Sequence, residues 1–440
     1  MKYSIITFGC RVNQADSLGF EEQLRARGAT EASSDSADVV IVNTCSVTAS
    51  ADQGARQTVR RLSRTNPRAR IVVTGCYATR RPDELGSLPQ VLRVVPNDSK
   101  PELVSWLSSY VNLTTSERFG EGEGSCGAVI EPGIAGRTAF TLRVQTGCAQ
   151  PCAYCIIPST RGAPKSVPLE TVIVEAGRVA GAGFKEIVLT GVHLGSYGRD
   201  LTPPSSIVEL LRGLGAWAGD EIQRQSDTRF RISSLEPMDC SGDVIDLVTH
   251  GACFAPHFHL PLQHASDRML EAMRRPYTLE QYSALVGSIR AKMPHAAIGS
   301  DVIVGFPGES DADFEVLARY LERSPLTHVH VFPYSDRPGT AASAMTNKVP
   351  GAEIRERAGR VREISDQLSR QFRASQLGSI HRSLTLADGS MALTGNYLKV
   401  LIPPGHARNE WVTVTVTEAG ARLRGEVSSA ERQPRQRLGG

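Results

Sequence analysis

The sequence lacks the features that define several broad classes of protein. It contains no run of about 18 apolar residues, the length that a membrane-spanning helix needs. Its first residues carry one lysine and only a short apolar stretch, which does not fit a secretory signal. We therefore expect a cytoplasmic protein without membrane contact, in a compartment where thiols stay reduced. Its nine cysteines are then metal ligands, catalytic thiols or small buried residues rather than disulfides.

The chain also has no large excess of positive or negative charge. The chain has 49 basic and 46 acidic residues, a balance too even to indicate a nucleic-acid partner by itself. With 40% hydrophobic residues the composition is that of a globular protein, not a disordered or fibrous one. Its 440 residues exceed the usual size of one domain, so several domains are expected.

The first part of the chain, residues 1–117, alternates strand and helix patterns. Short β-branched runs at 4–8, 39–43 and 71–74 are followed by helical patterns at 17–27, 51–63 and 82–88. This order predicts a parallel sheet covered by helices. Each of the three strands leads directly to a cysteine: Cys10, Cys45 or Cys76. Because ligands of open α/β sheets bind beyond the carboxyl ends of the strands, the three thiols are expected to converge.

The rest of the chain predicts two further domains of an α/β protein. A glycine- and glutamate-rich linker at 118–137 precedes six strand patterns, at 140–146, 186–191, 229–234, 257–262, 298–304 and 328–333. With helices between them, these strands predict a partial (βα)6 barrel over 138–375, which includes a trailing helix at 353–376. Residues 376–440 change to strand patterns at 383–386, 397–402 and 411–416, separated by turn residues, and predict a small antiparallel β-barrel.

The sharpest motif is a C-x-x-x-C-x-x-C run formed by Cys148, Cys152 and Cys155, just after a strand. Three thiolates within one loop can occupy three corners of a four-iron cluster and leave the fourth iron open. An open metal position is typical of a catalytic site. Two alternatives stay open at this point: a zinc site completed by a distant residue such as His193, and a set of buried structural cysteines.

The motif C-x-x-x-C-x-Tyr154-C after the first barrel strand resembles the radical S-adenosylmethionine superfamily. A three-cysteine α/β domain before the barrel and a small β-barrel after it resemble the methylthiotransferases of that superfamily, over essentially the whole chain. The resemblance implies two [4Fe-4S] clusters, S-adenosylmethionine as cofactor and an RNA-binding C-terminal module of the TRAM type. By the same resemblance, Cys148, Cys152 and Cys155 hold the radical cluster. Cys10, Cys45 and Cys76 would hold the auxiliary cluster, while Cys126, Cys240 and Cys253 match no ligand position.

Polar residues and glycines also cluster after the predicted barrel strands. In the superfamily these regions contact the methionine, ribose and adenine parts of S-adenosylmethionine, and glycine permits a close approach. The residues expected to bind the cofactor on this basis are Tyr154, Thr190, Gly191, Ser234, Glu236, Gln263 and Gly305.

Two basic regions are candidates for contact with RNA. Arg56, Arg60 and Arg64 are four residues apart and form one stripe on the predicted helix, where Asp52 is the only acid nearby in sequence. Such a stripe suits phosphate groups, although a solvated helix face has the same pattern. Residues 376–440 carry eight lysines and arginines against five acids. Small basic β-barrels commonly bind nucleic acids.

Three stretches favour one branch of the methylthiotransferases, the branch that modifies N6-threonylcarbamoyladenosine at position 37 of tRNA. They span residues 9–14, 189–198 and 328–335. One departure concerns the loop after Arg161, where Val167 stands in place of an expected arginine. The family's other branches act on isopentenyladenosine-37 of tRNA or on an aspartate of a ribosomal protein, and they remain alternatives. A non-enzymatic, zinc-containing RNA-binding protein is a more distant one.

The function predicted from the sequence is therefore the replacement of the C2 hydrogen of threonylcarbamoyladenosine by a methylthio group. Radical chemistry suits this reaction because no protein base can deprotonate such a carbon, and the cofactor carries the difficult step. The expected partners are the tRNA anticodon loop, whose target base can be splayed out, and a reductant such as flavodoxin or ferredoxin. We expect the protein to be a monomer.

Overall fold

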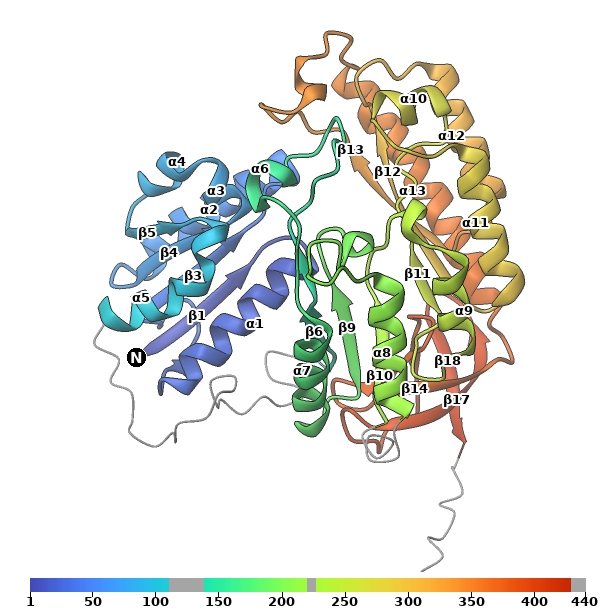
Figure 1. Cartoon of the computed structure of the whole chain (residues 1–440), viewed down its shortest axis with the longest axis horizontal. Coiled ribbons are helices and arrows are strands. Elements are labelled where there is room, and N and C mark those ends of the chain that lie inside the picture. Colours follow the sequence, from blue (N-terminus) through green and yellow to red (C-terminus); the bar gives the residue numbers. More distant parts are fainter. Residues whose placement is uncertain (111–137, 220–226, 429–440) are drawn as a thin grey trace, which may run out of the picture.

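The fold was analysed in a computed structural model, which describes residues 1–110, 138–219 and 227–428. The expected linker at 118–137 and Cys126 therefore lie outside the described residues, as does the basic tail from residue 429. Figure 1 shows three units: an N-terminal α/β unit, an open barrel of parallel strands, and a small closed barrel at the C-terminal end of the described chain. Within the described residues, no helix has the length and apolar character to cross a bilayer.

The N-terminal unit is a five-stranded parallel sheet in the order β2-β1-β3-β4-β5. Its strands are β1 (Lys2–Thr7), β2 (Thr30–Glu31), β3 (Val39–Thr44), β4 (Arg70–Gly75) and β5 (Val91–Val95). Its helices are α1 (Arg11–Ala26), α2 (Ala49–Thr65), α3 (Cys76–Arg80), α4 (Pro82–Gly86), the 3-10 helix η1 (Asn97–Glu102) and α5 (Leu103–Tyr110). β3 is buried along its whole length, as expected for a central strand with helices on both faces.

The predicted start of the first helix, at residue 17, was wrong by six residues, since α1 begins at Arg11. Its first turns are polar, and Asn13, Asp16 and Ser17 are buried there. These residues face hydrogen-bond partners instead of an apolar core, so hydrophobic periodicity cannot reveal them. β5 and α5 were not predicted at all.

The open barrel contains six parallel strands in chain order. They are β6 (Phe140–Arg143), β9 (Glu186–Thr190), β10 (Arg229–Ile232), β11 (His257–His259), β12 (Ala297–Val304) and β13 (His328–Pro333). β6, β9 and β10 form one sheet and β11, β12 and β13 another, and isolated bridges such as Ser234 to His259 join them. The short strands β7 (Gln145–Thr146) and β8 (Lys165–Ser166) pair beside β6. The partial barrel expected from the sequence is thus present.

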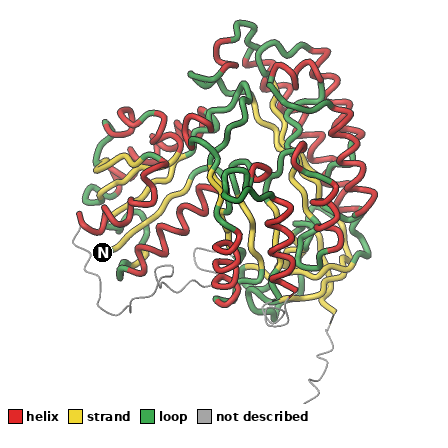
Figure 2. Tube along the Cα trace, viewed as in Figure 1, coloured by secondary structure: helices red, strands yellow, loops and turns green. Residues whose placement is uncertain are grey.

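Helices cover the outside of this barrel, as Figure 2 shows by colour. They are α7 (Leu169–Gly181), α8 (Ile207–Gly219), α9 (Gly242–His250), α10 (Asp267–Ala272), α11 (Leu279–Lys292), α12 (Asp311–Arg323) and α13 (Gly351–Ala374), with short 3-10 turns at Leu194–Ser196, Pro237–Asp239 and Ala341–Ala344. The short helix α6 (Ile157–Arg161) instead packs against the N-terminal unit (Figure 1). One continuous apolar core lies between the covering helices and the strands. Side chains on the other face of each strand point into the barrel interior, where the site is built.

The C-terminal unit is a closed five-stranded barrel in the order β14-β15-β16-β18-β17. Its strands are β14 (Ile380–Leu386), β15 (Met391–Thr394), β16 (Lys399–Leu401), β17 (Trp411–Ala419) and β18 (Leu423–Ser428). The expected antiparallel arrangement holds for four pairings, but β16 and β18 pair in parallel, which closes the barrel. The sequence analysis missed β15, which shows no strict alternation of apolar and polar residues, and β18, which alternates but carries Gly425 in its middle.

Buried arginines fix this small barrel under the amino ends of the parallel strands. Arg231 of β10 donates to the backbone oxygen of Gly395 at 2.8 Å, and its guanidinium stacks on Tyr397. The hydroxyl of Tyr397 also accepts a hydrogen bond from Arg11 of the N-terminal unit at 3.0 Å. The three units therefore contact one another directly, and α6, which follows the first barrel strands, lies beside the N-terminal unit (Figure 1).

Candidate active site: two groups of three cysteines

Cys10, Cys45 and Cys76 form an N-terminal cysteine group at the carboxyl edge of the first sheet. Cys10 caps α1 just after β1, Cys45 directly follows β3, and Cys76 opens α3 directly after β4. Since β1, β3 and β4 are neighbours in the sheet, the three thiols lie together. Burial raises the pKa of Cys45 to about 11, and the adjacent thiols of Cys10 and Cys76 also raise it.

Glycine is required for this close approach. Gly9 has a φ of +90°, and a Cβ at that position would lie 2.6 Å from the Sγ of Cys45. Any side chain at residue 9 would therefore push Cys45 away from Cys10. Gly75 has a φ of +101° and would place a Cβ against the backbone of Thr44. The Gly-Cys pairs at the ends of β1 and β4 are thus part of the geometry of the group.

Cys148, Cys152 and Cys155 form a loop cysteine group between β7 and α6. The backbone amides of Gln150 and Ile157 each donate to a cysteine sulfur, Cys148 and Cys155 respectively, at 3.4 Å. Burial raises the pKa of Cys155 to about 12, and the neighbouring thiols of Cys152 and Cys148 raise it further. The three thiols therefore converge, as the spacing predicted.

Gln145 holds this loop in place, and sequence reasoning missed it. Its amide nitrogen donates to the backbone oxygen of Gly147 at 2.8 Å. Its oxygen accepts from the backbone amides of Val192 and His193, at 3.0 and 2.9 Å. A single buried side chain thus ties the start of the cysteine loop to the segment after β9. One glutamine inside a strand pattern carries no sequence signal for such a role.

A buried arginine lies against each cysteine group. Arg275 donates to the Sγ of Cys152 at 3.1 Å and pairs with Glu236. Arg161 contacts Cys76 and lies close to Cys10; although its burial alone would lower its pKa, these thiols and Asp16 hold the pKa above its usual value. Cations beside converging thiols compensate the negative charge of a thiolate-bound iron–sulfur cluster. This donor set fits such a cluster at both groups.

The two groups face each other across an interface centred on Asp16. Its carboxylate lies 2.6 Å from Lys100 of the N-terminal unit and 3.3 Å from Arg161, and it also pairs with Arg143 of β6. Burial alone would raise the pKa of Asp16, but the three cations hold it below its usual range. α3, which begins at Cys76, packs against α6, which follows Cys155.

A cavity of about 190 Å³ opens between the loop cysteine group and the segment that follows Cys45. It is lined by Tyr154 and Cys155 from the cysteine loop, by Gln263, Asp301 and Ile303 from the barrel interior, and by Val47 and Thr48, which follow Cys45. Arg337 also lines it. This side chain is only 3% exposed, donates to Asp52 at 3.0 Å, and has no hydrogen-bond partner for its Nε and Nη2 among the described residues.

Of the residues expected to bind the cofactor, Tyr154 and Gln263 line this cavity, and the other five do not. Glu236 pairs with Arg275, and the buried hydroxyl of Thr190 accepts from Ser233 at 3.4 Å. Ser234 pairs through its backbone with His259, and Gly191 packs against Gln145. A Cβ on Gly305 would lie 2.7 Å from Cδ1 of Ile354, so this glycine makes room for α13.

His193, the residue named as a possible zinc ligand, contacts both Asp239 and, in the loop cysteine group, Cys148. Its Nε2 lies 2.8 Å from Asp239. Burial lowers the pKa of His193, but hydrogen bonds with Asp239 and Cys148 raise it to about 9. Asp239 and Cys148 therefore hold His193 beside the loop cysteine group.

The arginine stripe lies on α2 as expected, although its surroundings differ. Arg60 and Arg64 are exposed, but Arg56 stacks on Tyr77 and forms an ion pair with Glu84 at 3.0 Å. Asp52, the expected opposing acid, is buried and instead binds Arg80 and Arg337. The two outer arginines are thus the ones open to an RNA phosphate.

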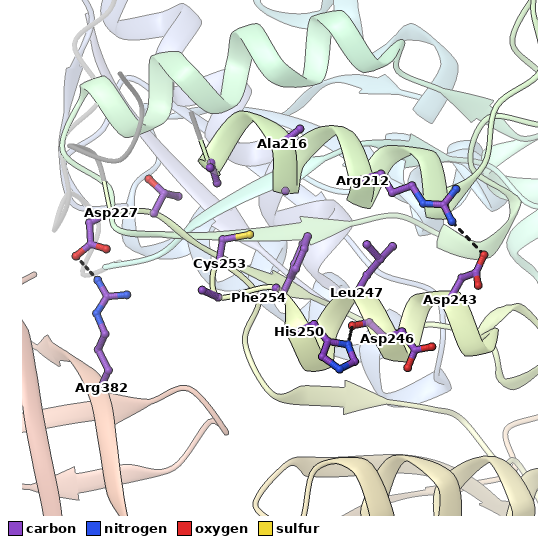
Figure 3. A pocket seen from close by; sticks show the side chains of 16 residues that line it. Arg212, Ala216, Asp227, Asp243, Asp246, Leu247, His250, Cys253, Phe254 and Arg382 are labelled. Atoms are coloured by element: carbon purple, nitrogen blue, oxygen red, sulfur yellow. Dashed lines mark hydrogen bonds and ion pairs between the residues drawn. The ribbon is translucent and has the colours of Figure 1, made fainter. Parts of the chain in front are cut away.

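A larger cavity, of about 850 Å³, lies at the opposite end of the barrel strands and contains none of the expected site residues (Figure 3). α8 and α9 line it, with ion pairs of Arg212 with Asp243 and of Asp227 with Arg382. Cys253 points into it (Figure 3). We assign it no ligand.

Comparison with known proteins agrees with this geometry. Residues 2–96 match the family described as "Uncharacterized protein family UPF0004", and residues 142–321 match the "Radical SAM superfamily". A threonylcarbamoyladenosine tRNA methylthiotransferase MtaB from Aquifex aeolicus is 37% identical, over 91% of this chain and 96% of that protein. The MtaB of Bacillus subtilis is 35% identical, over 84% and 81% of the two chains.

Relatives of other specificity are also similar. The ribosomal protein uS12 methylthiotransferase RimO of Salinispora tropica is 33% identical, over 86% of this chain and 82% of that protein. Among solved structures, the radical S-adenosylmethionine methyltransferase TsrM from Kitasatospora setae has a TM-score of 0.56 at 15% identity, covering 78% of this chain and 76% of that one. The similarity to the TsrM structure concerns the fold alone.

Proposed function

The chain belongs to the radical S-adenosylmethionine methylthiotransferases, enzymes that use S-adenosylmethionine and iron–sulfur clusters, and from this premise we propose that it methylthiolates C2 of N6-threonylcarbamoyladenosine at position 37 of tRNA. The observation that carries the proposal is the cavity between the loop cysteine group and the segment that follows Cys45, with Cys155 in its wall and Val47 opposite. A base placed there would lie between two candidate cluster sites.

Each cysteine group would hold one [4Fe-4S] cluster with an open iron. Cys148, Cys152 and Cys155 would hold the radical cluster, and Cys10, Cys45 and Cys76 the auxiliary one. When bound, these clusters and S-adenosylmethionine supply the radical that removes the C2 hydrogen and the methylthio group that replaces it. Tyr154 and Gln263 border the space beside the loop cysteine group and would orient the cofactor.

The protein's own residues would set the charge environment of the two clusters and the distance between them. Amide donors to Cys148 and Cys155, together with the guanidinium of Arg275 at Cys152, stabilise negative charge on the sulfurs. Arg161 does the same near Cys76, and its ion pair with Asp16 fixes the separation of the groups. Transfer between two separate centres depends on such a fixed geometry.

Arg337 favours threonylcarbamoyladenosine over isopentenyladenosine as the substrate. The threonyl group carries a carboxylate, whereas an isopentenyl group is purely apolar. A buried guanidinium with two unpartnered nitrogens in the cavity wall is costly unless a ligand satisfies them. A carboxylate matches its fork of donors in a bidentate way. Arg60 and Arg64 of α2 and the basic C-terminal region, residues 376–440, would contact the phosphates of the anticodon stem and loop.

The proposal is tested on the protein reconstituted anaerobically with iron and sulfide. We expect about eight irons per chain for the wild type and about four for a triple Cys10→Ala/Cys45→Ala/Cys76→Ala variant. Cys253→Ser, which lies in neither group, should keep about eight. Four irons in both the wild type and the triple variant would refute the second cluster.

The substrate is tested separately with a chemical reductant or with flavodoxin or ferredoxin as electron donor. The enzyme is offered tRNA with threonylcarbamoyladenosine, tRNA with isopentenyladenosine, or ribosomal protein, and the products are analysed by mass spectrometry of nucleosides and peptides. We expect a mass gain of one methylthio group on threonylcarbamoyladenosine only. Modification of either other substrate in its absence would overturn the assignment.

A further inference from the structure

Three histidines meet inside the open barrel, away from both cysteine groups. His259 ends β11, and His328 and His330 lie on β13. Val329 and Val331 alternate with the last two and pack into the core beneath the helices, so the histidines point into the barrel interior. β12 runs between the two histidine-bearing strands and contributes Gly299 and Asp301.

The three rings are spaced as they would be around one metal ion. One ligand atom from each histidine lies within 4.8 Å of the others. The ring centroids are 5.2 Å apart for His328 and His330, 5.7 Å for His259 and His330, and 6.1 Å for His259 and His328. With metal–nitrogen bonds of about 2.0–2.1 Å in tetrahedral geometry, centroids would be about 5 Å apart. Ligand nitrogens of a tetrahedral site lie about 3.4 Å apart, so binding would bring the present nitrogens, which lie within 4.8 Å of one another, closer by up to about 1.5 Å.

Gly299 leaves open the space into which the nitrogens converge. A Cβ at this position would meet Nε2 of His328 and lie 2.9 Å from Nδ1 of His259. The φ of Gly299 is not in the left-handed region, so its backbone conformation does not require glycine. Glycine is required here because a side chain would collide with the imidazoles of His328 and His259.

The remaining ring nitrogens fix the tautomers that a metal needs. Nε2 of His259 lies 3.0 Å from the carboxylate of Asp301, which keeps the proton on that nitrogen and leaves a lone pair on Nδ1. The hydroxyl of Thr327 lies 3.1 Å from the backbone oxygen of Ile298 and 3.1 Å from Nδ1 of His328; when it donates to the carbonyl, it accepts from Nδ1. The lone pair of His328 is then on Nε2. Both free lone pairs are the ones directed at the space beside Gly299.

We propose that His259, His328 and His330 bind one divalent transition-metal ion of the zinc class, with Asp301 orienting His259. Carboxylate–histidine–metal arrangements of this kind are usual in zinc sites, and imidazole ligands suit zinc, iron, nickel and copper. The ion would connect β11 to β13 across β12. Asp301 and Ile303 also line the cavity beside the loop cysteine group, so the ion would stabilise the floor of that cavity. The proposal does not depend on the substrate.

The test uses the reconstituted full-length enzyme, dialysed against a chelator and then against buffered Zn²⁺. Zinc and iron are measured together by mass spectrometry in the wild type, in His330→Ala, in Gly299→Ala and in His250→Ala, an exposed control on α9. We expect about one zinc per chain in the wild type and control, at least a tenfold loss in both site variants, and equal iron in all four. Because His330 is exposed, its variant should fold even if Gly299→Ala does not.

X-ray absorption at the zinc edge identifies the ligands. Nitrogen neighbours at about 2.0–2.1 Å support the histidine site, whereas sulfur neighbours at about 2.3 Å would place the zinc at cysteines and overturn the proposal. Unchanged zinc in His330→Ala, or no zinc in the wild type, would overturn it as well.

Discussion

Arg161 and Asp16 connect the two cysteine groups across the interface between the N-terminal unit and the open barrel. Nη2 of Arg161 lies 3.3 Å from Oδ2 of Asp16, and the same guanidinium contacts Cys76. Arg161 follows Cys155 by six residues, and Asp16 follows Cys10 by six. One buried ion pair thus sets how the two candidate cluster sites face each other.

Replacement of Asp16 by Asn should loosen this interface. The side chains of Lys100 and Arg161, both buried, would lose their common counter-ion, and breaking a buried pair costs about 3–5 kcal/mol. We expect a lower melting temperature by calorimetry and methylthiotransferase activity reduced by about 10-fold or more. Asp35→Asn, at an exposed residue of the same unit, serves as control. Equal melting temperatures for the two variants would contradict the role of Asp16.

Gly9→Ala should remove the N-terminal cluster and spare the other. The new Cβ would lie 2.6 Å from the Sγ of Cys45. Gly28→Ala is a matched control, because Gly28 has a φ of +76° but nothing within 4 Å of its would-be Cβ. Both variants carry the strain of a left-handed residue, about 1–3 kcal/mol. Reconstituted Gly9→Ala should hold about four irons and Gly28→Ala about eight.

Arg275→Met should make the cluster at the loop cysteine group harder to reduce. The variant loses a hydrogen bond to Cys152 and a buried positive charge, and both stabilise the more negative, reduced state. We expect a more negative midpoint in a redox titration followed by electron paramagnetic resonance, and activity lower by about 10–100-fold. Arg362→Met, at an exposed position of α13, should leave the midpoint unchanged. An unchanged midpoint in Arg275→Met would argue against electrostatic tuning.

Arg337→Met should reduce discrimination for the substrate carboxylate. Wild type and variant are compared on tRNA with threonylcarbamoyladenosine and on the same tRNA with its threonyl carboxylate converted to an amide. A charged hydrogen bond contributes about 1.5–3 kcal/mol, so the acid-over-amide ratio of kcat/KM should fall by about 10- to 100-fold. Asp52 keeps Arg80 as a partner in the variant. A ratio equal to that of the surface control Arg355→Met would mean that Arg337 does not read the carboxylate.

The buried carboxylate of Glu186 leads to a prediction of how the stability of the barrel depends on pH. It lies buried between Arg229, at 2.6 Å, and Arg231, at 3.0 Å. Burial alone would raise its pKa, but the two arginines lower it to about 2. A depressed pKa means that this stabilisation is present above the unfolded value of about 4.3 and is lost as pH falls toward 2. Thermal melts from pH 7 to 3 should fall more steeply for the wild type than for Glu186→Gln.

The sequence alone was sufficient to predict those features of the fold that depend on local or periodic patterns of residues. Strand runs of β-branched residues gave β1, β3 and β4, and the order of strands and helices gave the parallel arrangement. Parallel neighbouring strands end at one edge, so the convergence of Cys10, Cys45 and Cys76 followed from topology. The loop cysteine group is held within eight residues of chain, and its convergence is a matter of spacing.

Only the tertiary structure decided what surrounds these thiols. Arg275 reaches Cys152 across 123 residues and Arg337 reaches Asp52 across 285, and no pattern in the sequence relates such distant polar residues. The same holds for His259 and His330, which meet only because β11, β12 and β13 are adjacent. The hydrophobic periodicity of a sequence identifies the residues that become buried, because burial of an apolar side chain requires no particular partner or direction. The partners of buried polar groups depend on directional contacts that packing alone brings together.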